Sequence, residues 1–162
     1  MLTAPRGNDG GQITLLLIGY AVIAMVLVIV GVDASAVFLA RRALSSAADA
    51  AALDAAQAVD RTAVYSGSIG GCGDPLPIDD VVARARALAV VADDSDDLRR
   101  AFRVLDDADV SVDAGTVTVR LTGRAKVPFA ALLTVLAPGH DDGAVEISVT
   151  AHARSPVSFG AC

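Results

Sequence analysis

Residues 13–32 read ITLLLIGYAVIAMVLVIVGV, a stretch of 20 residues with no charged side chain. A helix of this length rises about 30 Å, which matches the hydrocarbon thickness of a bilayer. A core helix in a small soluble domain would carry a polar side, and this stretch has none. The stretch therefore predicts a transmembrane helix close to the start of the chain.

The rival interpretation is a cleavable secretory signal peptide, because residues 34–36 (ASA) fit the small-residue cleavage pattern. The apolar run exceeds the usual length of about 7–15 residues, and before it Arg6 is offset by Asp9. Residues 33–59 also contain no Gly or Pro and are dominated by Ala, the best helix former. We therefore predict that the transmembrane helix continues into an Ala-rich helical extension.

Along this extension a row of mostly small residues recurs at alternating spacings of four and three. The row consists of Leu39, Ala43, Ser46, Ala50 and Leu53, and the same spacing continues to Gln57. Small side chains at this spacing let two helices approach closely. Two interpretations are open: the row packs against the protein's own domain, or it contacts other subunits, including a second copy of the chain.

The rest of the chain predicts a linker followed by a small α+β domain. Residues 60–77 become rich in Gly, Pro and Ser, as in a loop. Residues 78–162 begin with a helical pattern over 78–91, a short helix ending at Phe102, and later a short apolar helix over 128–136. With the cytoplasmic segment 1–12, the span 13–32 and the extension 33–59, these ranges complete the expected organisation.

Strand signals in this domain come from apolar residues that alternate with polar ones. The alternating residues are Val110 and Val112, then Val117, Val119 and Leu121, then Val145, Ile147, Val149 and Ala151. A turn at 114–115 joins the first two groups into a hairpin. The pattern predicts an antiparallel sheet of about three strands, whose order the sequence does not give.

Charge and motifs argue against catalysis and nucleic-acid binding. Residues 59–162 carry 15 acids and 10 bases, a balance of −5 that repels nucleic acid. His140 and His152 stand in no catalytic motif, and the run at 93–97 (DDSDD) lacks the Gly and Glu of a calcium loop. We expect no catalytic residues, no cofactor and no metal site.

The two cysteines, Cys72 and Cys162, leave two alternatives open. They form one disulfide that closes a loop of about 90 residues, which requires an oxidising compartment. Otherwise they are two unrelated free thiols. The choice depends on which side of the membrane the domain occupies.

Several of these features occur together in an order typical of one family. Gly11 and Gln12 precede the apolar run, Asp33 follows it, and then come Arg41, Leu44 and the stretch 46–53 (SAADAAAL). Over residues 6–58 this order resembles the N-terminal segment of the TadE/TadG-like proteins of the Flp (Tad) pilus-assembly system. The resemblance implies a minor pilin-like or accessory protein of a bacterial cell envelope, with pilus-assembly or pilin subunits as partners.

The resemblance also implies the topology. Arg6 and the α-amino group precede the span while Arg41 and Arg42 follow it, so charge alone slightly favours a cytoplasmic domain. The family pattern places the N-terminus in the cytoplasm and the C-terminal domain outside the cell membrane, and we follow it. One departure is that a pilin cut after Gly11 would have Glu five residues later, where this chain has Leu16. We therefore expect an uncut, TadG-like protein.

The alternative function is a membrane-anchored extracytoplasmic ligand-binding or envelope protein that has no connection with pili. A neighbouring gene for a secretion ATPase and another for a small pilin would favour pilus assembly.

Overall fold

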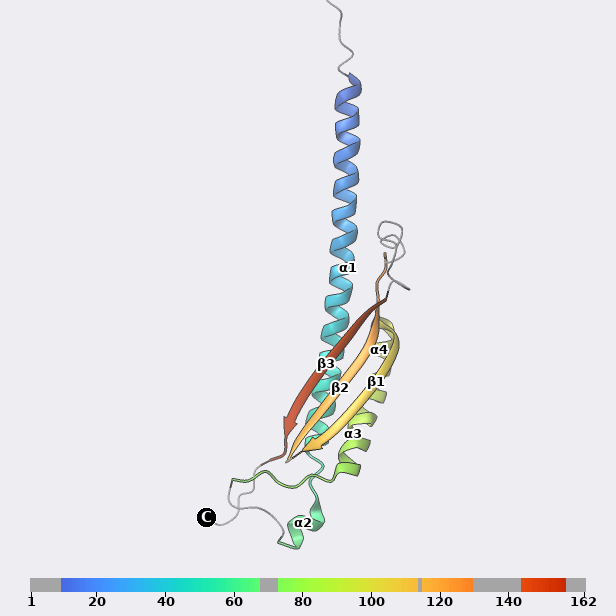
Figure 1. Cartoon of the computed structure of the whole chain (residues 1–162). Coiled ribbons are helices and arrows are strands. Elements are labelled where there is room, and N and C mark those ends of the chain that lie inside the picture. Colours follow the sequence, from blue (N-terminus) through green and yellow to red (C-terminus); the bar gives the residue numbers. More distant parts are fainter. Residues whose placement is uncertain (1–9, 68–72, 114, 130–143, 157–162) are drawn as a thin grey trace, which may run out of the picture.

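The computed structural model describes residues 10–67, 73–113, 115–129 and 144–156 of the chain (Figure 1). Within these ranges the elements are α1 (Gly10–Ala56), α2 (Arg61–Tyr65), α3 (Asp80–Asp93), α4 (Ser95–Ala101), β1 (Phe102–Asp113), β2 (Thr116–Lys126) and β3 (Ala144–Arg154). The predicted fold class, a long N-terminal helix followed by helices and a three-stranded antiparallel sheet, is confirmed.

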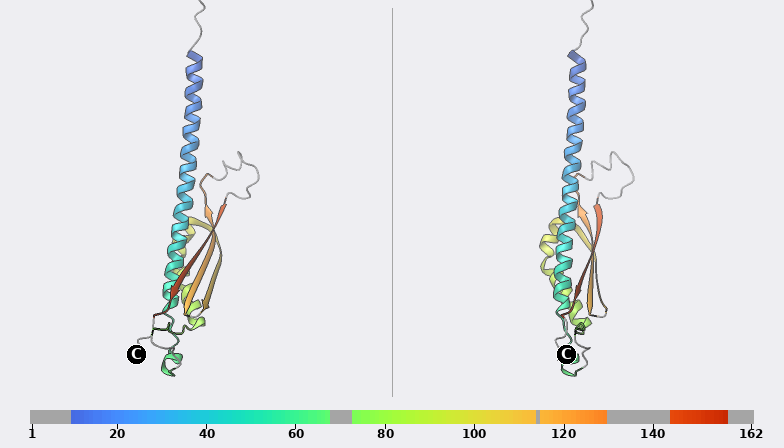
Figure 2. Two further views of the ribbon diagram at one scale, coloured as in Figure 1. Left: turned by 60° about the vertical axis from the view of Figure 1, so that its left-hand side comes forward. Right: turned by 90° about the vertical axis from the view of Figure 1, so that its left-hand side faces the viewer.

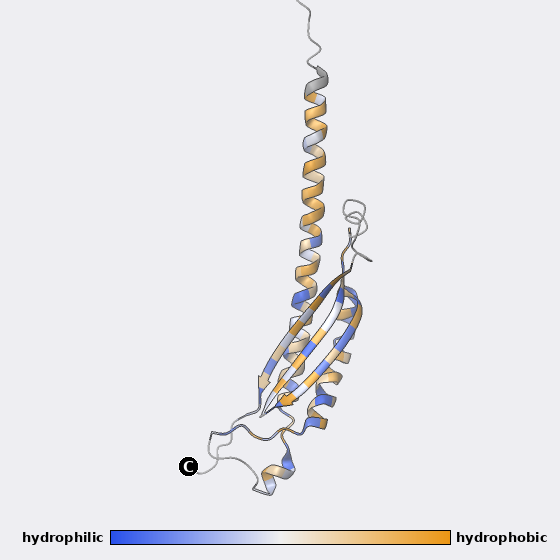
Figure 3. Ribbon diagram, viewed as in Figure 1, coloured by the Kyte–Doolittle hydropathy of each residue, from blue (hydrophilic) through white to orange (hydrophobic). Residues whose placement is uncertain are grey.

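Helix α1 is a single element of 47 residues, and its N-terminal half protrudes from the domain (Figures 1 and 3). The apolar side chains of this half, from Ile13 to Val32, are exposed on all sides except for Ile29, which is half-buried. Among the described residues, α1 is the one helix long and apolar enough to cross a membrane. Because water does not tolerate so large an apolar surface, this half fits the membrane span of a single-pass protein.

The C-terminal half of α1 packs on the sheet and on α3, and both helices lie on the same face of the sheet (Figure 2). The packed side of α1 is built almost entirely from Ala, with Leu44 as its largest buried side chain. Val117, Val119 and Leu121 of β2 meet this side and are fully buried. Because Ala side chains are short, the helix backbone lies close to the sheet and the core is thin.

The sheet is a meander in the order β1-β2-β3, with both pairs antiparallel. Buried and more exposed residues alternate regularly along β2. Val117, Val119 and Leu121 point to the helices, while Thr118 and Arg120 point away. The sequence predicts the inward residues of β2 correctly. It misses the first half of β1, because register shifts at Phe102/Val104 and Leu105/Asp107 break the period of two.

The segment 60–77, predicted to be a linker, is tied down at both of its ends. Val59 and Ile78 form a β-bridge, the Asp60 N–H donates to Pro77 O at 2.9 Å, and the Asp79 N–H donates to Ala58 O at 2.9 Å. The extension therefore ends as a helix at Ala56 rather than at residue 59. Cys72, Cys162 and the predicted helix beyond Phe129 lie outside the described residues.

The segment 60–77 also contacts the turn between β1 and β2. Gly115 has a φ of 77°, and a Cβ atom added to it would come within 2.7 Å of Pro75 Cβ. Ser155 donates its N–H to Gly115 O at 2.8 Å and its Oγ–H to Leu76 O at 2.8 Å. The turn, the segment around Pro75 and the end of β3 therefore meet at the end of the domain farthest from the apolar half of α1.

We predict that Gly115→Ala destabilises the protein more than Gly67→Ala. Both glycines have positive φ angles, but a Cβ atom at Gly67 meets nothing within 4 Å. A left-handed backbone costs a non-glycine residue about 1–2 kcal/mol at either site, and crowding against Pro75 adds about 1–3 kcal/mol at Gly115. Urea unfolding of the full chain in detergent micelles, followed by circular dichroism, measures both losses. Equal losses would show that the contact with Pro75 does not matter.

Candidate interaction surface

Beyond the apolar run, α1 has two different sides. The side packed on the domain consists of Ala40, Leu44, Ala47, Ala48, Ala51, Ala52, Ala55 and Ala56. The predicted row of Leu39, Ala43, Ser46, Ala50 and Leu53 lies on the other side of the helix, which we call the outer row. Leu39 and Leu53 are each 61% exposed, Ser46 and Ala50 are exposed, and Ala43 is half-buried. The domain of this chain thus leaves the outer row uncovered.

The outer row continues into the apolar half of the helix. Val32 and Met25 lie seven and fourteen residues before Leu39, on nearly the same side because seven residues make almost two turns. Both are exposed. Between them and Leu39, the Ser35 hydroxyl donates to Gly31 O at 2.8 Å, so this polar group is satisfied within the helix. One exposed strip therefore runs from the apolar half of α1 into the Ala-rich half.

A second surface feature is a groove of about 500 Å³ between α3, α4 and β1. It is lined by Leu88, Val91, Ala92, Ser95, Leu98, Arg99, Phe102, Arg103, Val104 and Leu105. The lining is mainly apolar and contains no carboxylate, imidazole or thiol. Two arginines at its rim provide positive charge, but the groove has no pair of groups that could act as nucleophile and base.

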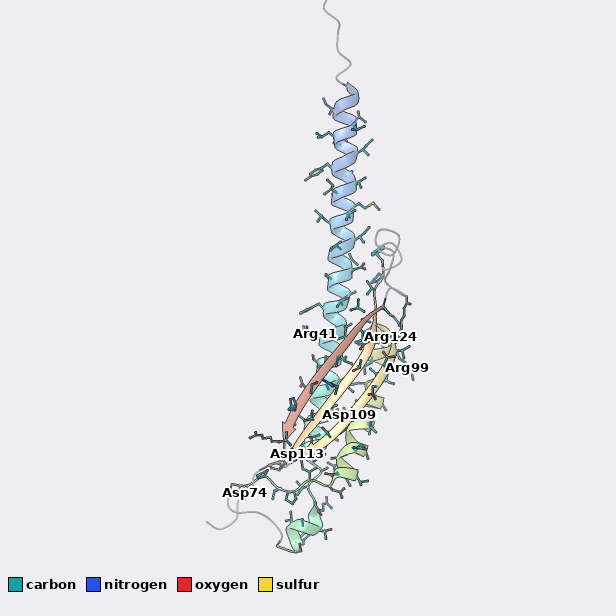
Figure 4. All side chains as sticks on the ribbon, viewed as in Figure 1. Arg41, Asp74, Arg99, Asp109, Asp113 and Arg124 are labelled. Atoms are coloured by element: carbon teal, nitrogen blue, oxygen red, sulfur yellow. The ribbon has the colours of Figure 1, made fainter. Side chains whose placement is uncertain are left out.

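The polar face of the sheet offers no catalytic arrangement either. His152 lies there in the open, with its Nδ1 2.9 Å from the Thr118 hydroxyl, and Arg124 forms an ion pair with Asp106 at 3.4 Å. Figure 4 shows Asp109 and Asp113 farther along the same sheet. Within the described ranges, no group of three or more His, Cys, Asp or Glu could hold a metal ion. His140 lies outside those ranges.

One contact that the sequence did not reveal involves Asp33. Asp33 follows the apolar run directly, yet its side chain is buried, with 6% of its surface exposed. Its Oδ1 accepts a hydrogen bond from the backbone N–H of Phe129 at 3.1 Å. The two residues are 96 positions apart, so no local pattern could have indicated this contact.

These features define a class of protein: a small α+β domain on a long apolar helix that carries an uncovered row of small residues. Within that class, residues 11–58 match the family of Flp pilus-assembly TadE/G-like proteins. The match confirms the resemblance for this segment, and it contains all five residues of the outer row. Comparison with curated proteins and with solved structures finds no match.

The two sides of α1 predict opposite effects for neighbouring substitutions. Ala51 is 0% exposed and lies in the core, so Ala51→Phe should destabilise the domain by about 1–3 kcal/mol or more through overpacking. Ala50 is exposed, so Ala50→Phe should cost at most about 1 kcal/mol, mainly from the lower helix propensity of Phe. Thermal unfolding of both variants in the same micelles measures the difference. A larger loss for Ala50→Phe would mean that the helix presents its other side to the domain.

Proposed function

We propose that this protein is a membrane-anchored pilin-like or accessory protein of Flp (Tad) pilus assembly that acts through protein–protein contacts. The main support for the proposal is that the residues matched by the family include the exposed outer row. The family match over 11–58 covers the apolar half of α1 and the outer row, and the outer row is turned away from the protein's own domain. In this proposal the outer row receives a helix of a pilus-assembly or pilin subunit.

The chemistry of the outer row supports a helix as the partner. In lipid, helices associate by close packing of small residues, since the hydrophobic effect adds little between apolar surfaces. Ala43, Ser46 and Ala50 supply small side chains beyond the span, and Leu39 and Leu53 border them. A partner helix that crosses the same membrane could follow the strip from the lipid into the water without changing direction.

Charges beside the outer row bear on whether the partner is a second copy. Suppose that the outer row forms the contact between two parallel helices. Asp49, just before Ala50, and Asp54, just after Leu53, then lie on either side of that contact. In a parallel pair in register, Asp49 of one helix would lie near Asp54 of the other, and like charges there disfavour pairing. We therefore infer that the partner is a different subunit or a copy shifted along the helix axis, and not a copy in register.

The proposed topology places residues 1–12 in the cytoplasm and the domain outside the cell membrane. The family match supports this orientation, and Leu16 in place of Glu supports an N-terminus that is not cut after Gly11. Outside the cytoplasm, Cys72 and Cys162 could pair as a disulfide. We propose no catalytic activity and no cofactor for this protein, in keeping with a pilus-assembly role.

The second candidate function is an extracytoplasmic ligand-binding or envelope protein, and the apolar groove between α3, α4 and β1 is the observation that favours it. The groove is the size of a small-molecule site but lacks the convergent polar groups that give such sites specificity. Substitutions in the groove therefore separate the two functions. A loss of function on Leu98→Ala with normal partner capture would favour the ligand-binding alternative.

We predict that Ala50→Phe weakens partner capture and pilus output while membrane insertion and domain folding remain intact. The bulky ring would hold two helix backbones apart at the centre of the outer row. Co-purification of pilus-assembly subunits and a piliation assay measure the effect. His152→Ala and Asp94→Ala, which change exposed polar groups away from the row, are the controls and should behave as the unchanged protein. If a control loses function while Ala50→Phe retains it, the outer row is not the contact surface.

We predict that a reporter that folds only in the cytoplasm is inactive when it is fused after Cys162. The same reporter fused before Met1 should be active, because the proposed orientation leaves that end in the cytoplasm. Reporter activity in intact cells, normalised to the amount of fusion protein, measures the orientation. Activity at the C-terminal fusion and none at the N-terminal one would reverse the topology.

A further inference from the structure

The contact between Asp33 and Phe129 fixes part of the domain at a particular height along α1. Asp33 is the first residue after the 20 uncharged residues at 13–32. The backbone N–H of Phe129 lies 3.1 Å from its Oδ1, so the chain just after β2 reaches the same height. Figure 1 shows the end of β2 rising beside α1 toward its apolar half.

The height of Asp33 corresponds to the edge of the lipid if α1 crosses a membrane. An uncharged stretch of this length fills the hydrocarbon layer, so the first carboxylate after it belongs in the headgroup region. Any group hydrogen-bonded to that carboxylate belongs at the same depth. Phe129 is therefore placed at the membrane surface by a contact within the protein, independently of its own side chain.

The side chains around this contact have the chemistry of an interfacial segment. Val127 is buried and anchors the segment to the domain, while the Phe129 side chain remains 41% exposed. Phe38 on α1 and Val145 at the start of β3 are also exposed at this end of the domain. An aromatic ring that stays exposed next to the end of a membrane span is typical of residues that anchor proteins at the interface.

Charged side chains of both signs lie at this end of the domain, where Arg124 is ion-paired with Asp106 and stands opposite Glu146 across β2 and β3. Lys126, the last residue of β2, donates from Nζ to the Arg99 carbonyl oxygen. Figure 4 shows Arg41, Arg99 and Arg124 at this end, whereas Asp74, Asp109 and Asp113 lie toward the other end.

We propose that the end of the domain at Pro128 and Phe129 inserts into the headgroup region of the membrane that α1 crosses, with the Phe129 ring at the acyl-chain boundary. The Asp33 carboxylate is the positioning group, because it binds the Phe129 backbone rather than the lipid. The domain is thereby attached to the membrane at two places, through the span and through this end. The proposal rests on α1 spanning the membrane and does not depend on a role in pilus assembly.

The test uses the absence of Trp from the sequence, so that one substitution introduces a single fluorophore. The full chain carrying Phe129→Trp is reconstituted into phosphatidylcholine and phosphatidylglycerol vesicles, with or without bromine on the acyl chains. We expect blue-shifted emission that brominated lipid quenches, to a degree between two reference variants. Leu17→Trp, within the span, gives the strongly quenched reference. Tyr65→Trp, at an 88% exposed position in α2 at the far end of the domain, gives the unquenched reference.

The role of Asp33 is tested by a matched pair in the Phe129→Trp background. Asp33→Ala removes the acceptor and should shift the emission to the red and reduce quenching, whereas Asp33→Asn keeps an acceptor oxygen and should preserve both. Circular dichroism of each variant, with the Phe129→Trp protein as reference, verifies that the domain is folded.

Two outcomes overturn the proposal. If Leu17→Trp is quenched and Phe129→Trp is no more quenched than Tyr65→Trp, the domain stands clear of the lipid. If Leu17→Trp is not quenched, α1 does not cross the membrane and the proposal fails with it. The first outcome leaves the co-purification test of the outer row unaffected, so failure of this proposal and failure of the pilus-assembly role are distinguishable. The second outcome would also remove the membrane anchor from the proposed function, which the Leu17→Trp control reports separately.

Discussion

The contact between the Ala-lined side of α1 and the sheet is the interaction on which the rest of the structure depends. Ala47, Ala48 and Ala51 have no side chain beyond Cβ, so the helix lies close against β2 and β3, and Leu44 is the largest buried side chain on this part of the helix. Each Å² of apolar surface that this contact removes from water stabilises the fold by about 25 cal/mol. Because helix and sheet are pressed together so closely, the domain cannot slide or turn on α1 without losing this contact.

This close packing determines what α1 offers to other molecules. One side of the Ala-rich half is covered by the protein's own sheet and by α3, which leaves the opposite side, with Leu39, Ser46 and Ala50, as the exposed one. Ser46 and Ala50 on that side are about as small as the residues that meet the sheet. With larger residues around the whole helix, neither the sheet nor a neighbouring helix could lie as close to its backbone.

The packing also fixes the height of the domain along α1. Since α1 is one unbroken helix, the position of the sheet along it is set by the residues that meet the sheet, from Ala40 to Ala56. That position brings the end of β2 level with Asp33, where the carboxylate accepts the Phe129 N–H. Asp33 is buried, and among the described residues its Oδ1 bonds to the Phe129 N–H while its Oδ2 has no partner, so this hydrogen bond in a poorly solvated place reinforces the placement.

The sequence by itself determined the elements whose signals are local. Twenty uncharged residues indicated the apolar half of α1, the absence of Gly and Pro indicated its extension, and strict alternation indicated β2 and β3. Only the tertiary structure decided which side of α1 is buried, because Ala occurs all around the extension and carries no periodic signal. It also revealed the first half of β1, hidden by register shifts, and the pairing of Asp33 with Phe129. Such contacts arise because folding brings distant segments together, and hydrophobic periodicity reports only on neighbours along the chain.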